Sequence, residues 1–337
     1  MTKRSRRLDR RTFLGGFAVG ALALAQAALA QSARKVTRIG VLTVGYVTAD
    51  MVGPKPRSPV VAALLRGLQE LGYAYGKDFV TEVRGGEAGP EHFRRLASEL
   101  VRLRVDVIVA PGPMLPALKQ ATSTIPVVMA GALDPVAQGL VKSLGQPGGN
   151  FTGFSLQSAD AVAKRLELLK ELVPDALLIA VLWEQTVIEQ WRVAEAAARE
   201  RGWRLLSIEV RNHGEIEPAL RAARDARAGG LLVLSGGILY LQARRLAELA
   251  IKSRLPAVYS LRPQVEAGGL MSYGADIVDT WRRAAVVVDK IVKGANPAQL
   301  PVQQPTKFEL VINLPAAQSI GLAIPPSVLL RADDVLQ

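Results

Sequence analysis

The sequence predicts an α/β protein built from two similar lobes, each a parallel sheet flanked by helices, with a ligand cleft between them. The main observation is an internal repeat, because segments 36–130 and 176–260 carry the same order of apolar runs and turns. A second observation is the alternation of short apolar runs, which end in Gly, Pro, Ser or Asp, with segments of helical period. The repeat is far longer than a solenoid unit and indicates a duplicated lobe. Two lobes that face each other leave a cleft in which a ligand can lie.

In the first repeat, strands are expected to alternate with helices. The strands are predicted near 39–44, 79–84, 105–110 and 127–130, and the helices near 60–71, 91–102 and 114–121. Gly89-Pro90-Glu91 is a typical helix start, since proline fits the first turn and an acid stabilises the positive end of the helix dipole. The run 105–110 is almost wholly apolar, which indicates a strand of a parallel sheet covered on both faces.

The second repeat predicts the same order, and the pattern changes after residue 260. Strands are expected near 178–182, 204–210, 230–234 and 257–259, with helices near 187–201, 215–228 and 240–254. A strand at 270–273, a helix at 277–293, a proline-rich link at 296–305, a strand at 308–313 and a tail follow. We expect lobe 1 to comprise residues 36–152 and about 274–303. Residues 153–273 with about 304–337 form lobe 2 or, at the C-terminal end, a crossing segment.

The N-terminus predicts an export signal over residues 1–30. A basic stretch with Arg10, Arg11, Phe13 and Leu14 precedes a short apolar run, and Ala28-Leu29-Ala30 is a typical cleavage site. The paired arginines resemble a twin-arginine signal, while Asp9 and Gly15 depart from it and leave ordinary Sec export open. No cysteine follows the cleavage site, so we expect a periplasmic, soluble protein without a lipid anchor.

Composition narrows the function classes. The chain has no cysteine, which rules out disulfides, thiol catalysis and thiolate metal sites. Its net charge is +12, of which residues 1–31 carry +5 and the mature part +7. The arginines are spread along predicted helices beside acidic residues, with no basic run interleaved with aromatics, so no nucleic-acid partner is expected.

An enzyme is the main competing class, and the sequence gives it little support. His92 and His213 each stand alone, and no zinc-protease motif, nucleophile elbow or phosphate loop occurs. We therefore expect no catalytic residue, no metal and no cofactor.

Six motifs carry a family resemblance. They are 65–73 (LRGLQELGY), 134–136 (DPV), 147–153 (PGGNFTG), 164–171 (KRLELLKE), 266–274 (EAGGLMSYG) and 304–313 (QPTKFELVIN). Together they resemble the ABC transporter substrate-binding proteins of the tryptophan/tyrosine type, over the chain from about residue 38 to the C-terminus. The resemblance implies a type I periplasmic binding protein-like fold that closes on a small solute and delivers it to an ABC permease of the inner membrane. A periplasmic subunit that senses a ligand for a signalling receptor remains the alternative. We expect a monomer.

Candidate ligand contacts follow from the carboxyl ends of the predicted strands, where open parallel sheets bind ligands. They are Gly45, Tyr46, Pro111, Gly112, Pro113, Asp134, Trp183, Glu184, Ser235, Gly236, Gly237, Tyr259, Ser272 and Tyr273. The backbone near Gly112 and Ser235-Gly236 is expected to hold a carboxylate of an amino acid or similar solute, with aromatic rings around its body. Asp134 and Glu184 are candidates for pairing with an ammonium group, and each acid and glycine also has a purely structural interpretation as a cap or turn. Asn150, Thr152 and Gly274 are predicted hinge positions.

Overall fold

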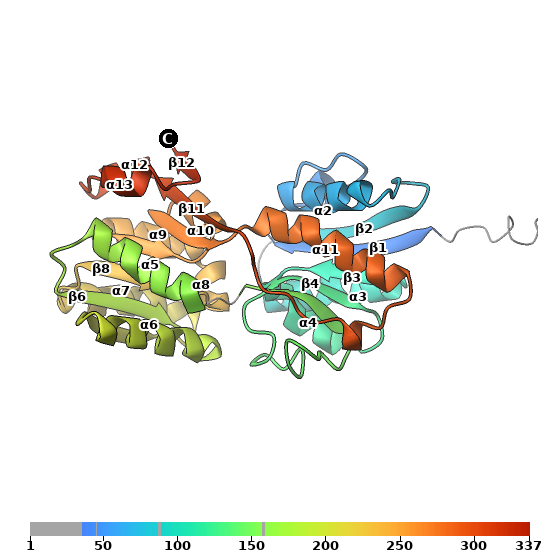
Figure 1. Ribbon diagram of the computed structural model, residues 1–337, viewed down its shortest axis with the longest axis horizontal. Helices are drawn as coiled ribbons and strands as arrows, with labels where there is room; N and C mark the ends of the chain where they lie inside the picture. Colours follow the sequence, from blue (N-terminus) through green and yellow to red (C-terminus); the bar gives the residue numbers. More distant parts are fainter. Residues whose placement is uncertain (1–35, 45, 87–88, 157–158) are drawn as a thin grey trace, which may run out of the picture.

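The computed structural model describes residues 36–44, 46–86, 89–156 and 159–337, which fold into two lobes side by side (Figure 1). Each lobe is built on one sheet with helices on both faces, so the predicted fold class is confirmed. The export signal predicted over residues 1–30 and the candidate residue Gly45 lie outside the described residues.

Lobe 1 contains a five-stranded parallel sheet in the order β2-β1-β3-β4-β5. Its strands are β1 (Thr37–Val44), β2 (Phe79–Gly86), β3 (Val107–Ala110), β4 (Val127–Ala132) and β5 (Phe151–Ser155). Its helices are α2 (Pro59–Glu70), α3 (Pro90–Arg102), α4 (Leu115–Ala121) and α11 (Ile277–Val292), with the short 3-10 turns η1 (Thr48–Met51), η2 (Gly112–Met114) and η5 (Pro297–Gln299).

Two apolar clusters sandwich the sheet of lobe 1. One cluster joins α2 and α11 to one face through residues such as Leu64, Leu68 and Trp281. The other joins α3 and α4 to the opposite face through residues such as Leu100 and Leu118. Every residue of β3 is buried, as its continuous apolar run predicts for a central strand covered on both sides.

Lobe 2 contains a seven-stranded sheet in the order β12-β11-β10-β9-β8-β6-β7, in which only the β10–β11 pair is antiparallel. Its strands are β6 (Leu178–Trp183), β7 (Arg204–Glu209), β8 (Gly230–Val233), β9 (Ala257–Tyr259), β10 (Met271–Ala275), β11 (Phe308–Asn313) and β12 (Asp334–Leu336). Its helices are α5 (Ala159–Leu172), α6 (Ile188–Glu200), α7 (Ile216–Asp225), α8 (Gly237–Leu241), α9 (Ala243–Lys252), α10 (Arg262–Glu266), α12 (Leu314–Ser319) and α13 (Pro326–Leu329). Two short 3-10 turns, η3 (Gln185–Val187) and η4 (His213–Glu215), complete it.

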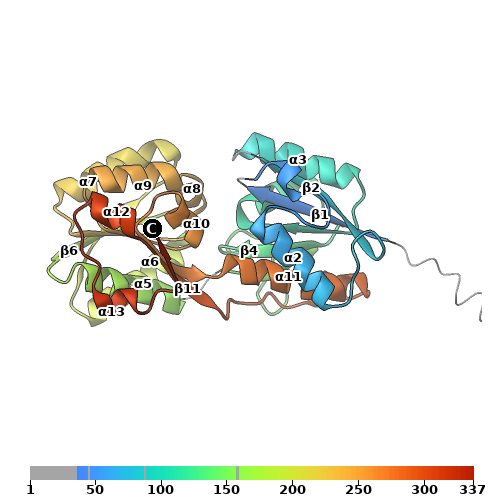
Figure 2. The same cartoon turned by 90° about the horizontal axis from the view of Figure 1, so that it is seen from above.

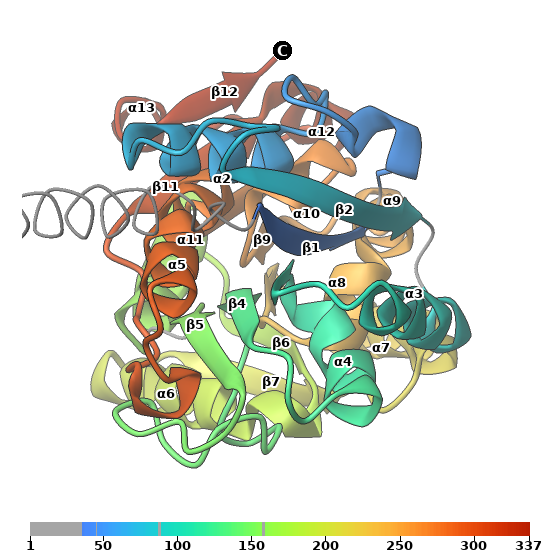
Figure 3. The ribbon, with the colours of Figure 1, turned by 90° about the vertical axis from the view of Figure 1, so that its right-hand side faces the viewer.

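The chain crosses between the lobes more than once, and Figure 2 shows α11 and β11, which adjoin two of these crossings, on one side of the molecule. The chain passes from β5 to α5, from β10 to α11, and back from η5 to β11. The third segment pairs with both others, because Gln303 N donates to Gly153 O at 2.8 Å and Asp276 N donates to Lys307 O at 3.1 Å. The second crossing places α11 in lobe 1, where it packs along α2 and β4 (Figure 3).

The structure adds elements that the periodicity did not predict. Thr152 is a predicted hinge position, but it lies in Phe151–Ser155, which forms the edge strand β5. The helix expected over 240–254 is divided into α8 and α9 at Gln242. The tail after residue 313 contains two short helices and β12, which pairs with β11. Among the described residues, no helix has the length and apolar character needed to span a membrane.

Candidate functional site

A cavity of about 450 Å³ lies between the two lobes. Lobe 1 supplies its wall from the ends of β1 and β3 and from α2 and α11, and lobe 2 supplies it from α8, α9 and α10. Its lining residues are Thr43, Val44, Tyr46, Val60, Pro111, Pro113, Ile277 and Trp281 of lobe 1 and Tyr240, Leu241, Ala243, Pro263 and Glu266 of lobe 2. The cavity is mainly apolar and aromatic, with a few polar groups, which is typical of a small-molecule site.

Trp281 is the largest side chain of the lobe 1 wall. It follows the second crossing by one turn of α11, whose N-cap is Asp276, with the Asp276 side chain accepting a hydrogen bond from Asp279 N at 2.9 Å. Thr280, Trp281, Ala284 and Ala285 are buried positions of α11 at helical spacing, so the amphipathic pattern turns this ring toward the sheet and the cavity. Only 1% of Trp281 is exposed.

Tyr46, Tyr240 and Glu266 meet across the cavity. Burial raises the pKa of Tyr240 to about 12, and the negative charges of Tyr46 and Glu266 add to the effect. Burial and the Glu266 charge likewise raise the pKa of Tyr46. The cavity lining thus includes a phenol from lobe 1 and a phenol and a carboxylate from lobe 2.

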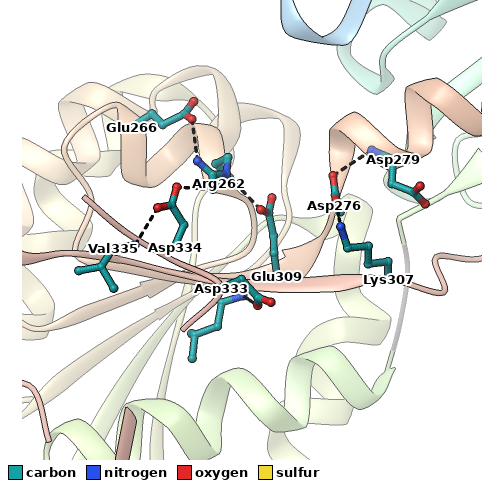
Figure 4. Close-up of polar contacts among 10 residues, drawn as sticks. Arg262, Glu266, Asp276, Asp279, Lys307, Glu309, Asp333, Asp334 and Val335 are labelled. Atoms are coloured by element: carbon teal, nitrogen blue, oxygen red, sulfur yellow. Dashed lines mark hydrogen bonds and ion pairs between the residues drawn. The ribbon is translucent and has the colours of Figure 1, made fainter. Parts of the chain in front are cut away.

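Glu266 also belongs to an ion-pair network in lobe 2 that is centred on Arg262 (Figure 4). The guanidinium of Arg262 contacts Glu266 Oε1 at 3.4 Å, Glu309 Oε2 at 3.1 Å and Asp334 Oδ2 at 2.6 Å. It therefore ties α10 to the two C-terminal strands β11 and β12. A second pair, Lys307 Nζ with Asp276 Oδ2 at 2.8 Å, joins the two crossing segments that flank this network.

Three of the lobe 1 candidates, Tyr46, Pro111 and Pro113, line the cavity. Gly112 is buried, and a Cβ there would lie 2.9 Å from Gly131 O, so this glycine permits a close backbone contact within lobe 1. None of the lobe 2 candidates lines the cavity. Their contacts are made within lobe 2.

Glu184 corrects the predicted carboxylate clamp of lobe 2. Its Oε1 accepts a hydrogen bond from Leu239 N at 2.8 Å, so the side chain caps the start of α8. A Cβ on Gly236 would overlap this carboxylate. Burial raises the pKa of Glu184, while hydrogen bonds from the N–H groups of Leu239, Ile238 and Gly237 oppose that rise. The predicted donors of lobe 2 are also satisfied within the chain, because Ser235 N donates to Gln190 Oε1 at 3.1 Å and Gly236 N donates to Leu234 O at 2.9 Å.

The aromatic and acidic candidates outside the cavity make internal contacts. Trp183 Nε1 donates to Ser207 Oγ at 2.8 Å, and its ring stacks on Trp191 with centroids 6.0 Å apart. Asp134 Oδ1 accepts from Ala137 N at 2.9 Å as a cap. The Asp134 contact matches the structural interpretation of that acid as a cap, and Trp183 packs within lobe 2.

Tyr259, Tyr273 and Ser272 also lie away from the cavity. Tyr259 is completely buried in the core between the sheet of lobe 2 and helices α7 and α9. The Tyr273 ring stacks on Phe308 with centroids 5.8 Å apart. Ser272 is completely buried in β10.

The predicted hinge residues lie beside the crossings. Asn150 Nδ2 donates to Ile125 O at 2.8 Å and Thr152 Oγ1 donates to Leu300 O at 2.7 Å, which fixes both residues in lobe 1 before the first crossing begins. Gly274 lies in β10, where a Cβ would overlap Ser260 O. Close backbone packing explains this glycine.

The sequence did not predict Tyr240, Glu266 and Trp281 as cavity residues. The candidates were taken from the carboxyl ends of strands, whereas these three residues lie on the helices α8, α10 and α11. Sequence reasoning also missed Arg165, which is 3% exposed and contacts Ser235 Oγ at 3.3 Å. Among the described residues, no carboxylate lies within ion-pair distance of Arg165, and burial lowers its pKa to about 10. A basic residue at a core-facing position of α5, beside Leu166 and Leu169, is the signal that was available.

Within the described part of the chain, no group of three or more His, Asp or Glu side chains could hold a metal ion. The lining of the cavity combines apolar side chains with the phenols of Tyr46 and Tyr240, the hydroxyl of Thr43 and the carboxylate of Glu266. Such a set can bind a small organic molecule by burial, ring contacts and charge.

Comparison with known proteins places this chain in a family. The family model described as ABC transporter substrate binding protein matches residues 49–336. A tyrosine-binding protein of Clostridioides difficile (strain R20291) is 24% identical over 253 residues, which cover 74% of this chain and 72% of that protein.

Two solved structures share the whole fold. A conserved domain protein of Vibrio cholerae is 28% identical with a TM-score of 0.75, covering 89% of this chain and 100% of that one. The ABC domain from Streptococcus pneumonia in complex with L-Trp is 26% identical with a TM-score of 0.75, covering 90% of this chain and 100% of that one. These matches confirm the resemblance that the six motifs carry. The chain belongs to the ABC transporter substrate binding protein family.

Proposed function

We propose that this protein captures a small ring-bearing organic solute of amino-acid size between its lobes and delivers it to an ABC permease. The observation that carries the proposal is the aromatic cavity to which both lobes contribute. A ligand held there contacts Tyr46 and Trp281 on one side and Tyr240 on the other, so it stabilises the form in which the lobes are close. The relatives that bind tyrosine and L-Trp support a solute of this class.

We also propose that the protein works in the periplasm. The predicted signal over residues 1–30 exports the chain to the periplasm, where it acts as a soluble monomer that supplies the permease. The closed pair of lobes is the surface that the permease recognises, and open protein without solute does not present it.

Calorimetry with L-tryptophan tests the proposal. Wild-type protein is expected to bind, and Tyr240→Ala to raise the Kd about tenfold or more, since an aromatic pair contributes about 0.5–1.5 kcal/mol beyond the area it buries. Tyr273→Ala is the matched control, because Tyr273 stacks on Phe308 outside the cavity and its loss should leave the Kd unchanged. Equal weakening by both changes, or by Tyr273→Ala alone, argues against this cavity as the binding site.

A further inference from the structure

The cavity wall carries negative charge and no positive charge among its described lining residues. Among the described residues that line it, Glu266 is the only charged side chain, and no lysine, arginine or histidine is present. The buried guanidinium of Arg165 contacts Ser235 and is not among them. A bound molecule therefore meets a carboxylate and no cation.

The network around Glu266 does not neutralise it. Arg262 contacts three carboxylates, and its contact with Glu266, at 3.4 Å, is longer than those with Glu309 and Asp334, at 3.1 and 2.6 Å. One guanidinium shared among three acids leaves a net negative charge, and the weakest contact falls on the acid that faces the cavity (Figure 4).

When the lobes close on a ligand, the Glu266 charge determines which charged group of the ligand is favoured beside it. The Glu266 side chain is 50% exposed, so water solvates it while the cavity is open. A ligand that displaces this water must replace its hydrogen bonds, because Arg262 contacts only one oxygen of Glu266 and burial of a charged carboxylate is costly where its hydrogen bonds are lost. An ammonium group supplies such a partner, whereas a second carboxylate adds repulsion.

The surrounding rings favour the same group. Tyr46, Tyr240 and Trp281 line the cavity with Glu266, and a cation held near such rings is attracted to their faces. Their side chains also provide the apolar surface that buries the body of an aromatic ligand.

We propose that Glu266 determines specificity by receiving the ammonium group of the solute, and that the cavity selects aromatic amines with no need for a carboxylate. This inference rests on the proposed function and names the chemical class of its ligand. It reverses the expectation of a carboxylate clamp, because the backbone N–H groups of Ser235 and Gly236 donate within lobe 2, to Gln190 Oε1 and Leu234 O, and Glu184 caps the helix start that follows them.

Three indoles of similar size test the contributions of the ammonium and carboxylate groups separately. They are tryptamine, which carries only the ammonium group, L-tryptophan, which carries both, and indole-3-propionate, which carries only the carboxylate. By calorimetry we expect tryptamine to bind at least as tightly as L-tryptophan, and indole-3-propionate about tenfold or more weakly than either. In Glu266→Gln the Kd of tryptamine is expected to rise about tenfold or more, so that its advantage over the acid disappears. Glu248→Gln, an exposed position of α9, is the matched control and should bind like the wild type.

The outcomes separate the two proposals. Tight binding of indole-3-propionate, a requirement for the carboxylate of L-tryptophan, or an unchanged tryptamine preference in a folded Glu266→Gln protein overturns the inference and leaves the proposed function standing. If none of the three indoles binds the wild type, the proposed function fails and this inference with it. A thermal melting curve of each variant shows that it is folded.

Discussion

Replacing Trp281 by alanine is expected to lower the free energy of unfolding by about 3–5 kcal/mol, the usual cost of truncating a buried tryptophan. Trp281 is 1% exposed and packs with Leu64 and Leu68 of α2 and Val109 of β3 in the core of lobe 1. Its removal leaves a void between α11 and the sheet. The same ring lines the interlobe cavity, so binding of L-tryptophan should weaken in a separate measurement.

Guanidinium unfolding followed by far-UV circular dichroism measures the loss of stability. Calorimetry on the folded protein measures the change in affinity for L-tryptophan. Trp281→Phe retains a ring and is expected to lose less than the alanine variant in both assays. Full stability in Trp281→Ala contradicts the packing described for α11. Unchanged affinity in Trp281→Ala contradicts its place in the binding wall.

Gly67→Ala is expected to destabilise lobe 1 although the change lies inside a helix. Alanine favours a helix over glycine by about 1 kcal/mol, so propensity alone predicts a gain. However, a Cβ at Gly67 would overlap the carbonyl oxygen of Arg282 and lie 2.8 Å from Ala285 Cβ. Helices α2 and α11 must separate to accommodate it, and overpacking of this kind costs typically about 1–3 kcal/mol.

We expect the packing cost to exceed the propensity gain, which denaturant unfolding measures directly. Gly145→Ala is the control, because a Cβ at Gly145 meets no atom within 4 Å. A more stable Gly67→Ala protein would show that α2 and α11 can move apart freely. The position of Trp281 would then be adjustable as well.

Much of the fold follows from local patterns. Strands β3 and β8 are short apolar runs between helical segments, so burial on both faces identifies them. Strand β5 was missed because its sequence FTGFS is short, contains glycine and follows a Pro-Gly-Gly turn that reads as a connection. Strand β12 was missed since Asp334–Leu336 is too short to show a period, and its place depends on pairing with β11.

The site was predictable only in part. Tyr46 and Pro113 follow strands, and the rule that ligands lie beyond strand ends places them in the cavity. Glu184 also follows a strand, but whether its carboxylate faces a solute or caps α8 depends on the path of a chain segment about 50 residues later. Tyr240, Glu266 and Trp281 face the cavity because of how α8, α10 and α11 are oriented, and that orientation is set by tertiary packing.

The central claim is that the solute lies between the lobes and draws them together. The chain has no cysteine, so Gln120→Cys in lobe 1 and Arg244→Cys in lobe 2, both exposed, allow one spin label on each lobe. Pulsed electron paramagnetic resonance then measures the distance between the labels with and without saturating L-tryptophan or tryptamine. We predict a shorter and narrower distance distribution with a ligand that calorimetry shows to bind. An unchanged distribution in the presence of bound ligand would contradict the account.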